Sequence, residues 1–220
     1  MSPPPRSFAV IGLGTFGSTV AKELARFGNY VIGIDINERA VSALADLISY
    51  AVIADARDEA ALREAGVGDC DVALIAIGED LEANVLSTIN AKMVGAETIW
   101  AKAINRTHHR ILSKLGAERV ILPEEEVGLH VAQVLHNPRM RNYLSMGNGF
   151  HVVNFLVPEE IGGKRLADLK LKERFRVRSL GVMRGTDFLG SEAENPLLKV
   201  EDKLMLLGRR NDLRDFAASL

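Results

Sequence analysis

Three glycines near the start of the chain have a spacing that suits phosphate binding. They stand at Gly12, Gly14 and Gly17, with Thr15 and Phe16 between the last two. The motif follows an apolar run and opens a helical pattern. In that setting the glycines allow a tight turn, a close approach of backbone to pyrophosphate and close helix–strand packing. The first N–H groups of the helix would face the phosphates. The motif predicts nucleotide binding, and the alternative is a turn that binds no ligand.

Further polar residues follow the next apolar runs. Asp35 ends the second run, and its carboxylate would accept hydrogen bonds from ribose hydroxyls, which favours an unphosphorylated ribose over NADP. Asp55, followed by Ala56, ends the third run, Gly78 follows the fourth and Lys102 follows the fifth. We expect these residues at one ligand-binding edge, because ligands of open α/β sheets bind outside the carboxyl ends of the strands. The alternatives are a turn cap for Asp55 and an ordinary solvated lysine for Lys102.

The elements that must position these residues follow a repeating strand–helix pattern. Short, continuous apolar runs predict strands buried on both faces at residues 8–11, 30–34, 51–54, 72–77, 98–101 and 119–122. Helical patterns lie between them at residues 18–27, 59–65, 82–94 and 107–115, and glycines stand where these helices would end. Repeated strand–helix–strand units with short connections predict a Rossmann-like, doubly wound parallel sheet.

The remaining chain does not continue this strand–helix pattern. A helix is expected at residues 124–136, and it has two interpretations: it packs back on the sheet, or it crosses to a second subunit. A second, basic helix is expected at residues 139–145. After it, strands at 151–157, 178–183 and 203–208 and helices at 165–169 and 211–218 predict a small α+β domain. A hydrophobic core of that size gives only marginal stability by itself, so dimerisation or docking on another surface would stabilise this domain.

Composition excludes several classes of protein. The 220 residues are 47% hydrophobic and 25% charged, which is typical of ordinary globular domains. The formal net charge of -2 gives no electrostatic signature of nucleic-acid binding. No apolar run approaches the ~18 residues of a membrane-spanning helix, and a single cysteine excludes an internal disulfide. We therefore expect a soluble, cytoplasmic protein whose residues 1–6 form an unstructured lead.

Residues for catalysis are harder to find. The five histidines include no pair placed with a carboxylate at metal-binding spacing, and none lies beside the glycine motif. A cluster of carboxylates, Glu124, Glu125 and Glu126, follows Pro123. Acids in a first helical turn complement the helix dipole; alternatively, one of them binds a divalent cation beside the phosphates. Position alone does not choose between these carboxylates.

Several stretches together resemble the regulatory subunits of Ktr/Trk-type bacterial potassium uptake systems. These stretches are residues 8–14, 33–37, 99–103 and 116–124. Residues 162–169 and 199–204 are similar to the TrkA-C domain. The resemblance covers almost the whole chain. It implies an RCK (KTN) nucleotide-binding domain at residues 7–122, crossover and linker helices at 123–149, and a TrkA-C domain at 150–220.

The resemblance also implies a function without catalysis. It suggests a cytosolic ring, an octamer built from dimers, at the inner face of the cell membrane on a separate potassium-translocating subunit. ATP, ADP or NAD(H) in the crevice would change the angle between paired domains. Ile36 and Asn37 would join Asp35 in the nucleotide site. Glu124 matches an acid that approaches the phosphates, where Mg²⁺ or Ca²⁺ would lie between two negative groups.

Two departures from the family pattern bear on ligand choice. Thr15 stands where Ktr-type relatives often carry an arginine that reaches a terminal phosphate, and a hydroxyl cannot replace a guanidinium there. At the positions of a cyclic di-AMP site in some TrkA-C domains, this chain has Lys172 and Arg178.

Two other functions compete with regulation of potassium uptake: an NAD-dependent oxidoreductase and a stand-alone NADH sensor. An oxidoreductase needs a proton donor in a substrate pocket, and the small second domain offers no clear candidate.

Overall fold

A computed structural model describes residues 4–220, and the chain divides into two compact units after Glu125. The predicted unstructured lead lies partly outside the described residues; residues 4–6 precede the first strand and are exposed. Within the described part of the chain, no helix combines the length and apolar character needed to cross a lipid bilayer.

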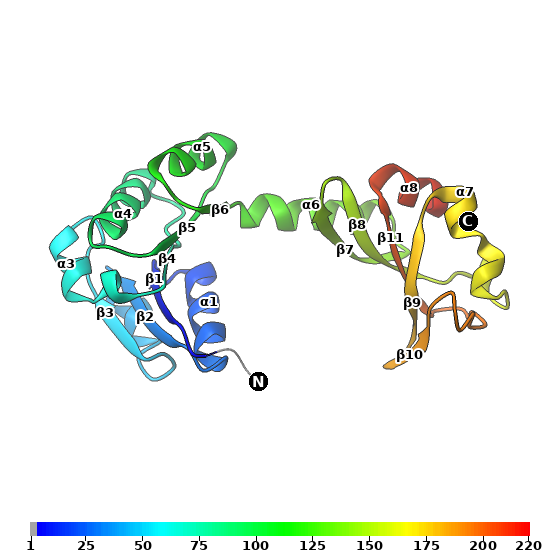
Figure 1. The fold of residues 1–220 in the computed structure, drawn as a ribbon, viewed down its shortest axis with the longest axis horizontal. Coiled ribbons are helices and arrows are strands. Elements are labelled where there is room, and N and C mark those ends of the chain that lie inside the picture. The colour runs from blue at the N-terminus through cyan, green and yellow to red at the C-terminus, as the bar shows by residue number, and fades with distance from the viewer. Residues whose placement is uncertain (1–3) are drawn as a thin grey trace. The chain divides into compact units, whose positions relative to one another are not determined.

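The first unit is built on a six-stranded parallel sheet with the order β3-β2-β1-β4-β5-β6 (Figure 1). The central strands are almost fully buried, as their continuous apolar runs predict. This topology confirms the Rossmann-like fold class. The strands are β1 (Ser7–Ile11), β2 (Tyr30–Asp35), β3 (Tyr50–Ile53), β4 (Val72–Ile75), β5 (Thr98–Lys102) and β6 (Arg119–Ile121).

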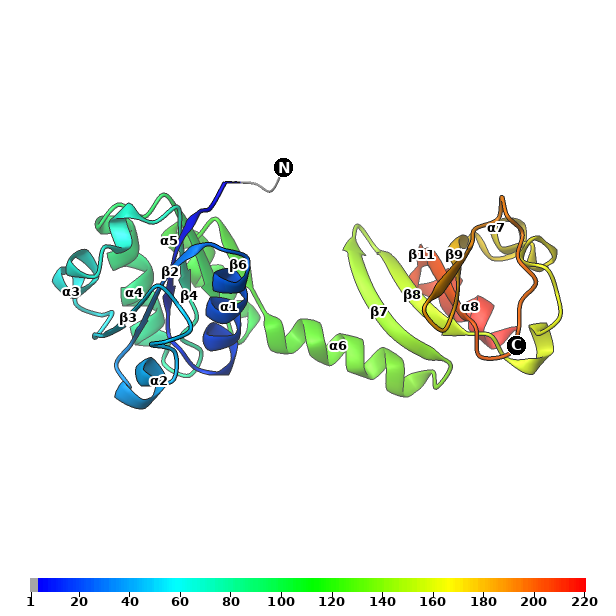
Figure 2. The same ribbon diagram turned by 90° about the horizontal axis from the view of Figure 1, so that it is seen from below.

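Helices cover both faces of this sheet, as Figures 1 and 2 show for α1 and α4. One face packs against α1 and α2 around Val10, Val31 and Leu44. The other packs against α3, α4 and α5 around Ile34, Ile75 and Leu112. The short helix α2 was not expected from the sequence. The bounds are α1 (Thr15–Arg26), α2 (Glu38–Ser42), α3 (Glu59–Glu64), α4 (Leu81–Met93) and α5 (Arg106–Leu115).

The second unit contains a five-stranded antiparallel sheet with the order β10-β9-β11-β8-β7. Its core includes Phe155 of β8 and Phe216 of α8, whose rings meet edge to face at 5.3 Å. This is the small α+β domain that the sequence predicts. The elements are α6 (Pro123–His136), β7 (Met140–Gly147), β8 (Phe150–Leu156), α7 (Leu171–Phe175), β9 (Arg178–Arg184), β10 (Asp187–Gly190), β11 (Lys203–Arg209) and α8 (Arg210–Ala218).

One predicted element is wrong. Residues 139–145 were expected to form a second basic helix, but residues 140–145 belong to β7 and Arg139 precedes it. The turn Gly147–Asn148–Gly149 has positive φ at all three residues and folds β7 back onto β8. The apolar residues of the stretch suit a helical spacing too, and pairing with the following strand, β8, decided between the two. The other differences are additions: α7 and β10 were not expected, and the helix expected at 165–169 is a 3-10 turn at Leu166–Leu169.

Candidate functional site

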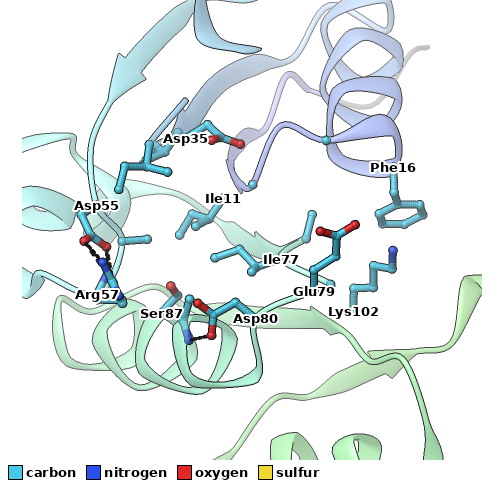
Figure 3. Close-up of a pocket in the computed structure, with 18 of the residues that line it drawn as sticks. Ile11, Phe16, Asp35, Asp55, Arg57, Ile77, Glu79, Asp80, Ser87 and Lys102 are labelled. Carbon is cyan, nitrogen blue, oxygen red and sulfur yellow. Dashed lines mark hydrogen bonds and ion pairs between the residues drawn. The ribbon is translucent and has the colours of Figure 1, made fainter. Parts of the chain in front are cut away.

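A crevice of about 910 Å³ opens at the carboxyl ends of the first unit's strands (Figure 3). Every site residue predicted from the sequence lines it except Gly17 and Asn37, which lie next to lining residues. The predicted residues that line it are Gly12, Gly14, Thr15, Phe16, Asp35, Ile36, Asp55, Ala56, Gly78, Lys102 and Glu124. The parallel topology explains this gathering, because it brings the ends of all strands to one edge.

Each glycine of the first loop occupies its position for a different structural reason. Gly12 has φ +94°, a conformation that side chains rarely adopt. A Cβ on Gly17 would lie 1.9 Å from the carbonyl oxygen of Gly12, so helix and loop can approach only without it. A Cβ on Gly14 would meet nothing within 4 Å. Gly14 therefore leaves open space where the loop faces the crevice.

Helix α1 begins without the cap that its neighbours have. Side-chain oxygens of Asn37, Asp58, Asp80 and Asn105 accept from main-chain N–H groups at the starts of α2, α3, α4 and α5. The N-cap of α1 is Gly14, which offers no side chain, and its first turn has no acid. The first N–H groups of a helix have no partner within it. This unshielded positive end of α1 fits a phosphate group.

Asp35 connects β2 to the glycine loop. Its Oδ2 accepts from the main-chain N–H of Leu13 at 2.6 Å, and its Oδ1 accepts from that of Asn37 at 2.8 Å. A carboxylate has about four acceptor sites, so each oxygen retains capacity for a ribose hydroxyl. Asn37 itself caps α2 and contributes no side chain to the lining.

Asp55 is engaged by Arg57 on both oxygens. Arg57 donates from Nε at 3.0 Å to each oxygen, from Nη2 at 2.7 Å to Oδ2 and from its main-chain N at 2.9 Å to Oδ1. These hydrogen bonds hold the pKa of Asp55 below its ordinary value. Both interpretations of Asp55 therefore have a basis: it lines the crevice, and it also fixes the turn after β3.

Lys102 and Glu124 form an ion pair at the other end of the crevice. Lys102 Nζ lies 2.6 Å from Glu124 Oε1 and 5.8 Å from the centre of the Phe16 ring. Only 12% of the Lys102 side chain is exposed, against 64% for Glu124. The lysine lowers the pKa of Glu124. Lys102 is thus held in the crevice rather than solvated, and its charge is available to a phosphate.

The sequence analysis missed several lining residues: Thr19, Arg57, Glu79, Asp80, Ala83 and Ser87. Glu79 and Asp80 directly follow Gly78, so extending that strand end by two residues would have found them. Ser87 belongs to the polar face of α4 with Asn84 and Asn90, all of them buried. Polar residues at this helical spacing on a buried face were the available signal.

The charged groups of the lining have an acidic excess. Asp35, Asp55, Glu79, Asp80 and Glu124 oppose Arg57 and Lys102. No group of three or more His, Cys, Asp or Glu side chains converges at metal-binding distances among the described residues. A divalent cation here would therefore need ligands beyond these side chains, and phosphate oxygens of a nucleotide are suitable ligands.

Comparisons with known proteins agree with the geometry. The TrkA-N domain family model matches residues 8–123. Ktr system potassium uptake protein A of Bacillus subtilis (strain 168) is 34% identical over 96% of this chain and 95% of its own length. The protein of the same name from Vibrio alginolyticus is 35% identical over 98% of both chains.

A solved structure extends the likeness of fold. The GsuK channel superposes with a TM-score of 0.68 at 14% identity, over 96% of this chain and 38% of the channel chain. At that identity the match shows the fold alone. The family model and the two relatives cover most of the sequence, so the chain belongs to the TrkA-N domain family and, within it, to the family of Ktr system potassium uptake proteins.

Proposed function

We propose that this protein is a nucleotide-binding regulatory subunit of a potassium uptake system. The observation that carries the proposal is the crevice between the uncapped start of α1 and the Asp35 carboxylate, in a chain similar to Ktr system potassium uptake proteins over nearly their whole length. A conductance site in this chain is not part of the proposal; a separate membrane protein translocates the ion.

The crevice suits an adenine nucleotide with an unphosphorylated ribose: ATP, ADP or NAD(H). Phosphates at the start of α1 would meet its free N–H groups and, nearby, Lys102. Free acceptor sites on Asp35 suit ribose hydroxyls and would repel a 2′-phosphate. The apolar lining by Ile11, Ile34 and Ile77 suits a flat base. Thr15 brings no charge to a terminal phosphate, so we do not assign it the discrimination of ATP from ADP.

We propose a cation beside the phosphates. The acidic excess of the lining would repel a nucleotide polyanion, and Mg²⁺ or Ca²⁺ between Glu124 and phosphate oxygens would offset that repulsion. In the structure, Glu124 is paired with Lys102. Glu124 therefore has to exchange its lysine partner for the cation when a nucleotide binds.

Assembly with further copies of the chain is also proposed. No residue of α6 is buried, although Val127, Val131 and Leu135 are apolar. We propose that α6 crosses between paired subunits and that dimers assemble into an octameric ring. The ring would lie in the cytoplasm at the inner face of the membrane, on its potassium-translocating partner. A net charge of -2 gives no support to nucleic acid as a partner.

Regulation follows from differential affinity. A ligand shifts a two-state equilibrium only by the difference in its affinity for the two states. A nucleotide whose phosphates replace the Lys102–Glu124 contact can supply such a difference.

We propose residues 7–122 as the sensing domain, 123–149 as the link and 150–220 as a TrkA-C domain. Cyclic di-AMP binding stays a prediction; Lys172 lies on α7 and Arg178 begins β9, both exposed.

One experiment tests the proposal against its competitor. ATP, ADP, NAD and NADH are titrated into the purified protein by calorimetry, and potassium uptake is measured in cells that lack the subunit and receive the wild-type or Asp35→Ala chain. We expect saturable binding and uptake that only the wild-type chain restores. Turnover of NADH with a carbonyl substrate, lost in Asp35→Ala, would establish the oxidoreductase instead. Absence of binding by all four nucleotides would contradict both functions.

A further inference from the structure

Helix α4 presents a row of buried polar side chains toward the crevice loops. Asn84 Nδ2 donates to the carbonyl oxygens of Ile77 and Lys102, after β4 and at the end of β5. Asn90 Nδ2 donates to those of Ala56 and Arg57, after β3, at 3.2 and 2.8 Å. These amides bind protein and fix the loops. Ser87 lies between them on the same helix.

The hydroxyl of Ser87 differs from its neighbours. Ser87 is fully buried, and its Oγ has no hydrogen-bond partner among the described residues. Thr88, the next residue, uses its hydroxyl to bond back to the carbonyl oxygen of Asn84 at 2.8 Å, but Ser87 does not. An unpaired buried hydroxyl destabilises a folded protein. Ser87 also lines the crevice. Asn84 Oδ1 is unpaired as well, but Asn84 is not a lining residue.

The position of Ser87 places it at the base end of the crevice. Figure 3 shows it on the same side as Arg57 and away from Phe16 and Lys102. Ser87 precedes Asn90 by three residues on α4, and Asn90 binds the main chain of Arg57. Phosphates at the start of α1 and a ribose at Asp35 direct the base to this end. The apolar residues Ile11, Ile34, Ala54, Ala56 and Ile77 line the slot between them.

The acid at this end is not free to recognise a base. Both oxygens of the Asp55 carboxylate already accept from Arg57, through its main-chain N–H, its Nη2 and an Nε–H shared between the two oxygens. A base amine would have to displace the arginine to reach it. Ser87 Oγ needs no displacement, and it can donate or accept a hydrogen bond.

We propose that Ser87 is a specificity-determining residue whose hydroxyl hydrogen-bonds the polar edge of the purine base. The inference rests on the proposed nucleotide site and adds the residue that reads the base. A base would satisfy the buried hydroxyl, so the protein without ligand is destabilised by a group that the complex uses. A purely structural serine would instead stabilise the protein in both states.

Ser87→Ala separates these roles, because it should have opposite effects on stability and binding. Without nucleotide, we expect the midpoint of thermal unfolding to rise by about 2–4 °C, since an unpaired buried hydroxyl is removed. With ADP, we expect the Kd to rise about three- to tenfold, the range for one neutral hydrogen bond. Ser87→Cys replaces the hydroxyl by a somewhat larger thiol that forms only weak hydrogen bonds, so it should weaken ADP binding similarly. Ser113→Ala, an exposed serine on α5, is the matched control.

Analogues locate the contact on the base. ADP is compared with diphosphates of purine riboside and of 1-deaza-, 3-deaza- and 7-deazaadenosine, each of which lacks one polar group of the base edge, and with inorganic pyrophosphate. We expect Ser87→Ala to leave the affinity for pyrophosphate unchanged. It should also leave unchanged the affinity for one of the four analogues, the one that lacks the polar group contacted by Ser87. Equal ADP affinity of wild type and Ser87→Ala, or the same loss with pyrophosphate, would overturn the inference alone. Failure of the wild type to bind any nucleotide would overturn the proposed function with it.

Discussion

The carboxylate of Asp35 accepts a hydrogen bond from the main-chain N–H of Leu13 at 2.6 Å, which ties the end of β2 to the glycine loop. Its other oxygen accepts from Asn37 N–H at 2.8 Å. The residue expected to bind ribose thus also fixes the loop expected to bind phosphate. We therefore predict that ribose and phosphate binding are coupled through this side chain.

Replacement of Asp35 should therefore damage both parts of the site. We expect Asp35→Ala to weaken adenine nucleotide binding by about 1–3 kcal/mol, the typical loss for hydrogen bonds to a charged group. Asp35→Asn should also weaken binding, because its amide has one accepting oxygen for the two main-chain N–H groups of Leu13 and Asn37 and faces the other with an NH₂. Calorimetry on both variants checks this. Wild-type affinity in both would remove Asp35 from the site, and wild-type affinity in Asp35→Asn alone would contradict the need for both main-chain contacts.

A second prediction concerns the cation and Glu124. We expect Mg²⁺ or Ca²⁺ to tighten ADP or ATP binding in the wild type, because a cation between carboxylate and phosphate removes their repulsion. Glu124→Gln should reduce this dependence. Titrations with the divalent cation and with a chelator measure it.

Glu125→Gln is the matched control for that prediction. Glu125 pairs with Arg106 at 3.0 Å and does not line the crevice. It should keep the cation dependence of the wild type. If Glu124→Gln keeps that dependence too, Glu124 is only an acid at a helix start, worth about 0.3–1 kcal/mol through the helix dipole.

Much of the first unit could be predicted from the sequence, because its signals are local. Continuous apolar runs followed by Gly or Asp identified the strands and the crevice edge together. The 3.6-residue pattern also predicted α4, but not that Ser87 lacks a partner while Asn84 and Asn90 bind loops. That distinction depends on tertiary contacts across the sheet. Asp55 and Arg57 are only two residues apart, but whether their side chains meet depends on their rotamers, which the sequence does not show.

The second unit shows where sequence reasoning failed. Tyr143 pairs with Val153 across a hairpin, and the apolar spacing of residues 139–145 alone does not distinguish a strand from a helix. The turn Gly147–Asn148–Gly149 was visible in the sequence, and glycines beside Asn are a hairpin signal. Applied there, that signal would have favoured strands on both sides over the predicted helix at 139–145.

A third prediction tests the assembly through α6. Val131 is 45% exposed on this helix. If this face packs against a second copy, Val131→Asp would bury an unpaired charge, which is strongly unfavourable. The variant should then have a lower mass by light scattering and unchanged circular dichroism. Gln133→Asp adds the same charge to the same helix on a polar position and should keep the wild-type mass. Wild-type mass in both variants would contradict an interface at Val131.

The last prediction concerns acid sensitivity and His108, which is only 1% exposed on α5. Neither ring nitrogen has a hydrogen-bond partner among the described residues. Burial lowers the pKa of His108, so the folded protein binds a proton at this ring only at a lower pH than the unfolded chain does. In the unfolded chain the ring binds a proton below its ordinary pKa of about 6.5. The unfolded state then holds more protons than the folded state, and the free energy of unfolding decreases as the pH falls below that value.

Replacing His108 should remove its part of this loss. We expect His108→Leu to show a smaller decrease in the free energy of unfolding between pH of about 7.5 and about 5.5 than the wild type, by at most ~1.4 kcal/mol per pH unit. Urea unfolding at the two pH values measures the difference. His109→Leu, which changes the neighbouring, half-buried histidine of α5, is the matched control for loss of a histidine from this helix. Burial and nearby Arg210 also lower the pKa of His151, so part of the acid sensitivity should persist in His108→Leu. An unchanged decrease in His108→Leu would mean that the folded protein accommodates the protonated ring, against what its burial and unpaired nitrogens imply.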